Sequence, residues 1–231
     1  MMQYYALDPV TSLRNDIDFL DFSVDPDAIR KWNTSLNSAT NLLWYNMIGN
    51  VAFVGFAGAF PESVLAPHLD EACRWLGSVA PRPNWVFVVG HWNTGGGEFN
   101  PCPHMDTPSV YRRLLATPGC KEFGTRLKYQ DGHEHCNHVQ ERVTPTGEAI
   151  GFMVGASGMG GCSQYGFEYL DSSGGELRVV YFELENASGT SRSDLVFDCI
   201  REHGLPSCTH LGSAWFQSSS ADNDKISRDS I

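Results

Sequence analysis

A strand, a helix and a second strand follow one another in the first half of the chain, and this pattern constrains the fold more than any other stretch. Asn50–Phe56 is short, β-branched and aromatic, which predicts a buried strand, and Pro61 opens a helix that extends to about Val79. Trp85–Val89 then predicts a second buried strand. Strands joined by such a helix are parallel, and ligands bind at their carboxyl ends. We therefore expect a functional site near His91, which follows the second strand.

The rest of the chain continues in short strands and helices. Thr107–Leu115 predicts a helix, and Leu127–Tyr129 predicts a brief strand. A polar loop follows the next histidines, and another strand is expected at Ile150–Ala156. Two alternating segments, Gly166–Leu170 and Leu177–Leu184, are joined by a Ser-Ser-Gly-Gly turn and predict an antiparallel hairpin. The sequence thus predicts a mixed α/β fold.

The two ends of the chain are less regular. Residues 1–46 contain only short helical patterns, at 25–32 and 39–45, whereas residues 193–203 have the pattern of an amphipathic helix. The Ser- and Asp-rich stretch 217–231 predicts disorder. We find no internal repeat.

The composition argues against two classes of partner. With 231 residues, of which 42% are hydrophobic, the chain can bury a sizeable core. Its formal net charge of -11 and its pI near 5.0 give a negative field that repels nucleic-acid phosphates and anionic lipids, so we expect neither as a partner. No apolar run is long enough to span a membrane. A phosphate-ester substrate would need local cations, such as a bound metal ion.

The seven cysteines and the sequons leave the cellular compartment open. Cys102 and Cys120 bracket one loop and helix, and they either form a disulfide in an oxidising compartment or stay as two reduced thiols. The residues after Met1 lack the features of a signal peptide. In contrast, the Asn-x-Ser/Thr triplets at Asn33 and Asn186 favour a secreted parent protein.

Three histidines lie within the stretch Gly132–His138, and they predict a metal site. His133 and His135, two residues apart, point to the same side of an extended loop, and both rings can reach one ion. His91 would add a third nitrogen from the neighbouring strand end. A structural zinc site with Cys136 as a thiolate ligand is the alternative.

Four blocks of sequence occur in an order that is known from one protein family. They are Asn50–Phe56, Val88–Trp92, Gly132–His135 and Gly158–Gly161. In this order and spacing, over about residues 45–185, they resemble the calcineurin-like metallophosphoesterases, which include the purple acid phosphatases and many phosphodiesterases. The resemblance implies a metallophosphoesterase-type β-sandwich of two mixed sheets packed face to face with flanking helices, an α/β/β/α four-layer fold.

The resemblance also implies a chemistry. The family holds two divalent or trivalent ions (Fe, Zn or Mn) at the strand ends, and by position His91 and His133 would bind the second ion and His135 the first. The two ions lower the pKa of a bridging water, which attacks the phosphorus of a phosphate ester. Three neighbouring polar residues are candidates to orient a ligand or to contact the substrate: His138, Asn93 and Asn137.

The chain departs from the family pattern in its first 46 residues. They contain no Asp-x-His, Gly-Asp or Gly-Asn-His block, and so lack the bridging carboxylate and the leaving-group acid that the family places there. Residues 1–190 are therefore expected to be the C-terminal portion of a metallophosphoesterase domain, incomplete at the N-terminus, followed by a short helix and a disordered tail over 191–231. Asp8, Asp16 and Asp131 are the nearby candidates for replacement, and none has the family's sequence context.

Two functions of different classes follow from these observations. The first is a metal-dependent hydrolase of phosphate esters, with no catalytic residue assigned in this chain. We expect little or no turnover, because no residue replaces the missing bridging ligand and positioned acid. The alternative is a non-catalytic binding or interaction module on a degenerate phosphoesterase scaffold, holding one ion or none.

Overall fold

The computed structural model describes residues 43–94, 104–143, 147–155, 162, 165–185 and 188–218, and these residues have the mixed α/β fold that the sequence predicts. The helices are α3 (Glu62–Ser78), α4 (Thr107–Ala116) and α5 (Ser193–His203). Three 3-10 segments accompany them, η1 (Lys121–Arg126), η2 (Ser173–Gly175) and η3 (Leu205–Leu211). Within this part of the chain, no helix combines the length and the apolar character that crossing a membrane requires.

A six-stranded sheet carries the predicted strand–helix–strand unit. Its strands, in spatial order, are β1 (Leu43–Ile48), β2 (Val51–Phe56), β3 (Trp85–Val89), β4 (Leu127–Asp131), β6 (Glu148–Val154) and β5 (Asn137–Val143). The central pairs β2–β3, β3–β4 and β4–β6 are parallel, whereas β1 and β5 are antiparallel to their neighbours. The predicted parallel pairing around α3 is therefore confirmed.

A separate three-stranded antiparallel sheet consists of β7 (Tyr165–Asp171), β8 (Arg178–Glu185) and β9 (Ser213–Gln217). Strands β7 and β8 form the predicted hairpin. The sequence does not predict β9. The expectation that disorder begins at Gln217 is wrong for the first two residues, because Gln217 pairs with Arg178 and the buried Ser218 donates from its N–H to the Leu177 carbonyl (2.9 Å). Residues 219–231 lie outside the described residues.

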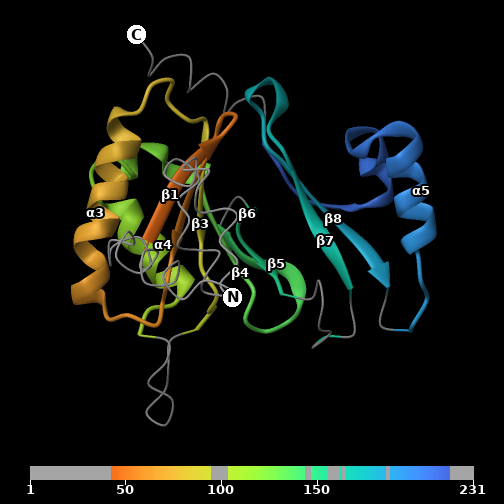
Figure 1. The fold of residues 1–231 in the computed structure, drawn as a ribbon, viewed down its shortest axis with the longest axis horizontal. Helices are drawn as coiled ribbons and strands as arrows, with labels where there is room; N and C mark the ends of the chain where they lie inside the picture. Colours follow the sequence, from red (N-terminus) through yellow and green to blue (C-terminus); the bar gives the residue numbers. More distant parts are fainter. Residues whose placement is uncertain are drawn as a thin grey trace, which may run out of the picture.

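The elements stack in layers, as Figure 1 shows. Side chains on one face of the six-stranded sheet, such as Val54 and Val88, form a core with α3 and α4. Those on the other face, such as Phe87 and Phe152, pack against the three-stranded sheet. Helix α5 covers the outer face of that second sheet, where Val196 is fully buried. Both faces of the central parallel strands are thus covered, as such strands require.

The two edge strands of the six-stranded sheet, β1 and β5, were not predicted from the sequence. The helical piece expected at 39–45 is wrong from Leu43 onward, because β1 pairs along its whole length with β2. Gly49, in the two-residue turn between them, has a φ of 62°, the left-handed conformation that such turns need. The polar loop expected after the histidines is β5 instead. Its polar sequence suits an edge strand, which has one side open to solvent.

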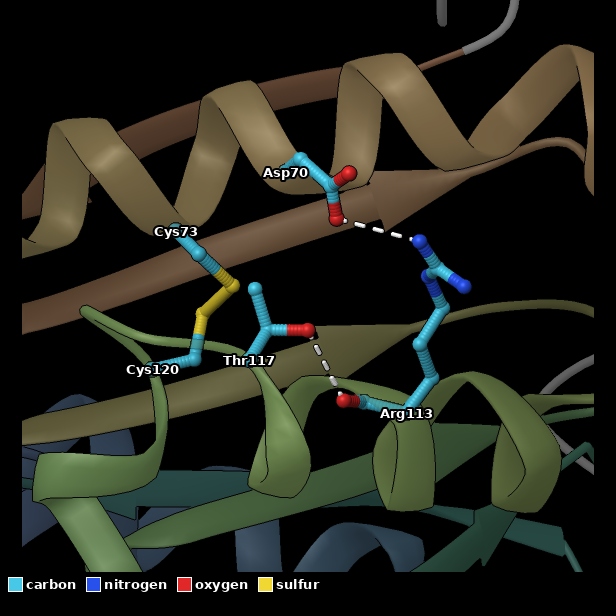
Figure 2. The surroundings of a disulfide bond; sticks show 5 residues. All are labelled: Asp70, Cys73, Arg113, Thr117 and Cys120. Atoms are coloured by element: carbon cyan, nitrogen blue, oxygen red, sulfur yellow. Dashed lines mark hydrogen bonds and ion pairs between the residues drawn. A yellow bond between two sulfur atoms is a disulfide. The ribbon is translucent and has the colours of Figure 1, made fainter.

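Six of the seven cysteines are joined in three disulfides: Cys73–Cys120, Cys136–Cys162 and Cys199–Cys208. Both alternatives for Cys102 and Cys120, a disulfide between them or two reduced thiols, are wrong for Cys120, which is bonded to Cys73 on α3 (Figure 2). Cys102 lies outside the described residues. A zinc site with Cys136 as thiolate ligand is also wrong, because that sulfur is in a disulfide. Three disulfides are typical of proteins that mature in an oxidising environment.

Glu168 on β7 places a carboxylate in the space between the two sheets. Its neighbours Phe167 and Tyr169 pack toward α5, so Glu168 points the opposite way, and it lies beside Tyr181 in the register of the hairpin. Both carboxylate oxygens are buried and have no hydrogen-bond partner in the described part of the chain. Burial raises the pKa of Glu168 to about 8.

We expect Glu168→Gln to increase the free energy of unfolding by about 2 kcal/mol at alkaline pH. The folded-state pKa of Glu168 is raised, so the stability of the unsubstituted chain is fully present below its ordinary value of 4.5 and is lost as the pH rises through about 8. Glutamine carries no charge at any pH. Urea unfolding at about pH 5 and about pH 8.5 measures the difference, which should be small at the lower pH. Glu122→Gln, at an exposed position of η1, is the control, and a pH-independent difference would contradict the prediction.

Candidate functional site

The carboxyl ends of β3 and β4 bring the two predicted histidine segments side by side. These strands are parallel neighbours, so the loops that follow them leave from the same edge of the sheet. Backbone hydrogen bonds continue the pairing beyond the strands. The Gly90 N–H donates to the Gln130 carbonyl (3.0 Å), and the Gly132 N–H donates to the His91 carbonyl (3.1 Å). Gly90 has no room for a side chain, since a Cβ there would lie 2.7 Å from the Phe56 ring.

His91 and His133 face each other across these loops. The Nε2 atom of His91 lies 3.3 Å from Nδ1 of His133, and the ring centroids are 5.2 Å apart. The Trp92 ring lies beside both, with its centroid 5.0 Å from that of His91 and 6.4 Å from that of His133. Partial burial, followed by the charges of His133 and His135, lowers the pKa of His91. This shift favours the neutral imidazole, which is the form that binds metal ions.

His135 is placed differently from the other two. Among the described residues, no hydrogen bond or ring contact joins His135 to His91 or His133. Its φ is 53°, so the chain turns there and does not have the extended conformation that the His-x-His spacing was expected to give. Gly155 packs against this turn, since a Cβ on it would lie 2.7 Å from the His135 nitrogen. The structure thus places His91 and His133 in direct contact, and His135 near enough to His91 for its charge to lower the pKa of that ring.

The three polar candidates have different surroundings. Asn93 is 7% exposed, and its Nδ2 donates to the Glu134 carboxylate. Asn137 is also buried, and its Nδ2 donates to the Tyr181 hydroxyl of β8 (2.9 Å), which links the two sheets. His138 is exposed on β5. Asn93 is therefore the candidate that contacts the segment carrying His133.

Asp131, a candidate to replace the missing carboxylate, is buried at the end of β4. With its amide nitrogen turned inward, Gln140 donates to both carboxylate oxygens of Asp131, at 2.9 and 2.7 Å. Burial raises the pKa of Asp131 to about 7, although the hydrogen bond from Gln140 opposes the rise. Both oxygens are thus engaged with β5. Asp8 and Asp16 lie outside the described residues.

Glu134 and Trp92 also lie at the candidate site, and the sequence did not predict them there. Each is directly adjacent to a predicted ligand, Trp92 to His91 and Glu134 to His133. Their position next to a predicted ligand was the only sequence signal for a role at the site. That position does not tell which way the side chains of Trp92 and Glu134 point. The orientation comes from the paired loops, which the sequence does not specify residue by residue.

The separation of the two histidine nitrogens fits one metal ion. Two nitrogen ligands at about 2.0–2.1 Å from a tetrahedral Zn²⁺ lie about 3.3–3.4 Å from each other. The separation of His91 Nε2 and His133 Nδ1 is 3.3 Å. In the part of the chain that the structure describes, no group of three or more His, Cys, Asp or Glu side chains is arranged to hold a metal ion. The described residues thus offer two nitrogen ligands and leave the other positions to water or substrate.

Comparison with known proteins adds no family assignment. No protein-family model matches the chain, and no curated protein matches it.

Proposed function

We propose that this chain is a metal-binding protein of the calcineurin-like metallophosphoesterase type, with a site that serves the hydrolysis of phosphate esters. The observation that carries the proposal is the 3.3 Å separation of His91 Nε2 and His133 Nδ1 at the ends of two parallel strands. Two packed sheets with helices outside them support it. A bound cation would also supply the positive charge that a chain of net charge -11 needs to hold a phosphate ester.

The chemistry is divided among a few residues. His91 and His133 would hold the ion through Nε2 and Nδ1, while the backbone bond between Gly132 and His91 keeps their loops together. A bound Zn, Mn or Fe ion would polarise a phosphoryl oxygen and lower the pKa of a bound water. The lowered pKa of His91 keeps a nitrogen lone pair available for the ion. The Trp92 ring lies beside both imidazole rings. A second ion on His135 stays a prediction.

A binding module that holds one ion without turnover is the second candidate. The observation that favours it is the shortage of acidic ligands among the described residues, where both oxygens of Asp131 accept hydrogen bonds from Gln140. A missing bridging ligand and a missing acid remove transition-state stabilisation that two histidines do not replace. The two candidates therefore share the ion and differ in turnover.

Replacing His91 or His133 with alanine is expected to lower the affinity for Zn²⁺ on the order of 100-fold. Losing even an outer partner of a metal ligand costs about 10–100-fold, and each substitution here removes a direct ligand. Isothermal titration of the purified chain with Zn²⁺ and Mn²⁺ measures the affinity. His203→Ala, at the exposed end of α5, is the control. Unchanged affinity in both site variants would overturn the proposed site.

Turnover separates the two candidate functions. The chain is assayed with p-nitrophenyl phosphate and with the bis(p-nitrophenyl) ester in Zn²⁺, Mn²⁺ and Fe²⁺. Metal-dependent hydrolysis that His133→Ala abolishes supports the hydrolase. Bound metal without hydrolysis of either ester supports the binding module. We expect slow turnover at most, because the nearby carboxylates among the described residues are already engaged, Glu134 with Asn93 and Asp131 with Gln140.

A further inference from the structure

Two hydrogen bonds bracket the histidine pair, one between backbones and one between side chains. On one side, the Gly132 N–H donates to the His91 carbonyl (3.1 Å). On the other side, Asn93 Nδ2 donates to the carboxylate of Glu134. The segments 91–93 and 132–134 are therefore joined both before and after the two facing rings.

The Asn93 amide has only one orientation that satisfies this bond. A carboxylate accepts hydrogen bonds and donates none, so the amide nitrogen must face Glu134. Asn93 Oδ1 is then buried and has no donor among the described residues. An unpartnered buried oxygen costs about 1–3 kcal/mol. This cost offsets what the Asn93–Glu134 hydrogen bond contributes to stability. A functional role therefore explains the bond better than stability does.

We infer that Asn93 and Glu134 are positioning residues, whose hydrogen bond holds His91 and His133 at metal-binding separation before an ion arrives. The inference rests on the proposed function, since it concerns the same ion site. Both histidines are exposed, so packing alone does not fix their rings. Joining the two segments removes part of the ordering cost that metal binding would otherwise carry.

Glu134 has a simpler possible role, which is to attract any cation through its negative charge. Three substitutions distinguish the two roles. Glu134→Gln keeps an acceptor oxygen for Asn93 and removes the charge, whereas Glu134→Ala removes both. Asn93→Ala removes the donor and keeps the charge of Glu134. Because Asn93→Ala also removes the unpartnered oxygen, we do not expect it to unfold the chain.

The full chain is titrated with Zn²⁺ by calorimetry, and bound Co²⁺ is followed by its absorption spectrum, which reports ligand geometry. We expect Asn93→Ala and Glu134→Ala each to lower the Zn²⁺ affinity about tenfold. The double variant should lose about as much as either alone, because one bond is removed in all three. Glu134→Gln should stay within about threefold of the unsubstituted chain and keep its Co²⁺ spectrum. Glu122→Ala, at an exposed position of η1, makes the same charge change away from the site.

The binding measurements distinguish a failure of the positioning role from a failure of the proposed metal site. Equal losses in Glu134→Gln and Glu134→Ala, with full affinity in Asn93→Ala, mean that Glu134 acts by charge alone and overturn the inference. Additive losses in the double variant overturn it as well. If His91→Ala and His133→Ala lose affinity while the Asn93 and Glu134 variants do not, the inference fails and the proposed site stands. If the histidine variants keep full affinity, the proposed site itself fails.

Discussion

Glu148→Ala is expected to lower the free energy of unfolding by about 3–5 kcal/mol, the usual cost of removing one member of a buried ion pair. The Nζ atom of Lys128 lies 2.5 Å from Glu148 Oε1 and donates to the Ala149 carbonyl (3.0 Å). The Lys128 side chain is 0% exposed, and its Nζ lies 4.0 Å from the centroid of the Phe216 ring. Neither this aromatic face nor this carbonyl carries the full negative charge that Glu148 places beside the buried ammonium.

A paired substitution separates the charge from the packing. Lys128→Met combined with Glu148→Gln removes both charges and is expected to recover most of the loss, because no buried charge is then left to be compensated. Urea unfolding near neutral pH measures each variant. Asp198→Ala breaks the exposed pair with Arg201 on α5 and serves as the control, with an expected loss below about 1 kcal/mol. An equally small loss for Glu148→Ala would show that the Lys128–Glu148 pair contributes no more to stability than an exposed ion pair does.

The centre of the fold is readable from the sequence because its strands are buried on both faces. Strands β2 and β3 are continuous apolar runs, and the helix between them has a regular apolar face. The edge strand β5 is different, because its residues are mostly polar and only the pairing with β6 makes them a strand. Strand β1 carried a usable signal, since Gly49-Asn50 between two apolar runs is a typical hairpin turn.

The site was predictable in part, for a geometric reason. His91 and His133 each follow a strand of the parallel unit, so the predicted topology alone places them at one edge. The left-handed turn at His135 is not readable from the His-x-His spacing, because it goes with the close packing of Gly155 from another strand end. The Asn93–Glu134 bond likewise depends on how the two loops pair. The sequence therefore did not predict the contacts between the loops at the strand ends.

Removing one disulfide with Cys73→Ala and Cys120→Ala is expected to lower the free energy of unfolding by about 4 kcal/mol. The two cysteines are 47 residues apart, and freeing a loop of that length restores much conformational entropy to the unfolded chain. Both are fully buried between α3 and the start of η1. Beside them, Arg113 of α4 donates to Asp70 of α3 (3.0 Å; Figure 2), so the helical layer keeps other links when the disulfide is absent.

The disulfide between Cys199 and Cys208 offers a matched control, because its cysteines are only 9 residues apart. Replacing that pair with alanine is expected to cost about 2.5 kcal/mol, and equal losses for the two pairs would refute the loop-length argument. Urea unfolding without reductant measures both. The Zn²⁺ affinity of the folded variants then shows whether the disulfide acts on the unfolded chain or on the folded site. A bond that acts mainly on the unfolded chain should leave the affinity within about twofold although the stability falls, since His91 and His133 are held by their own strands.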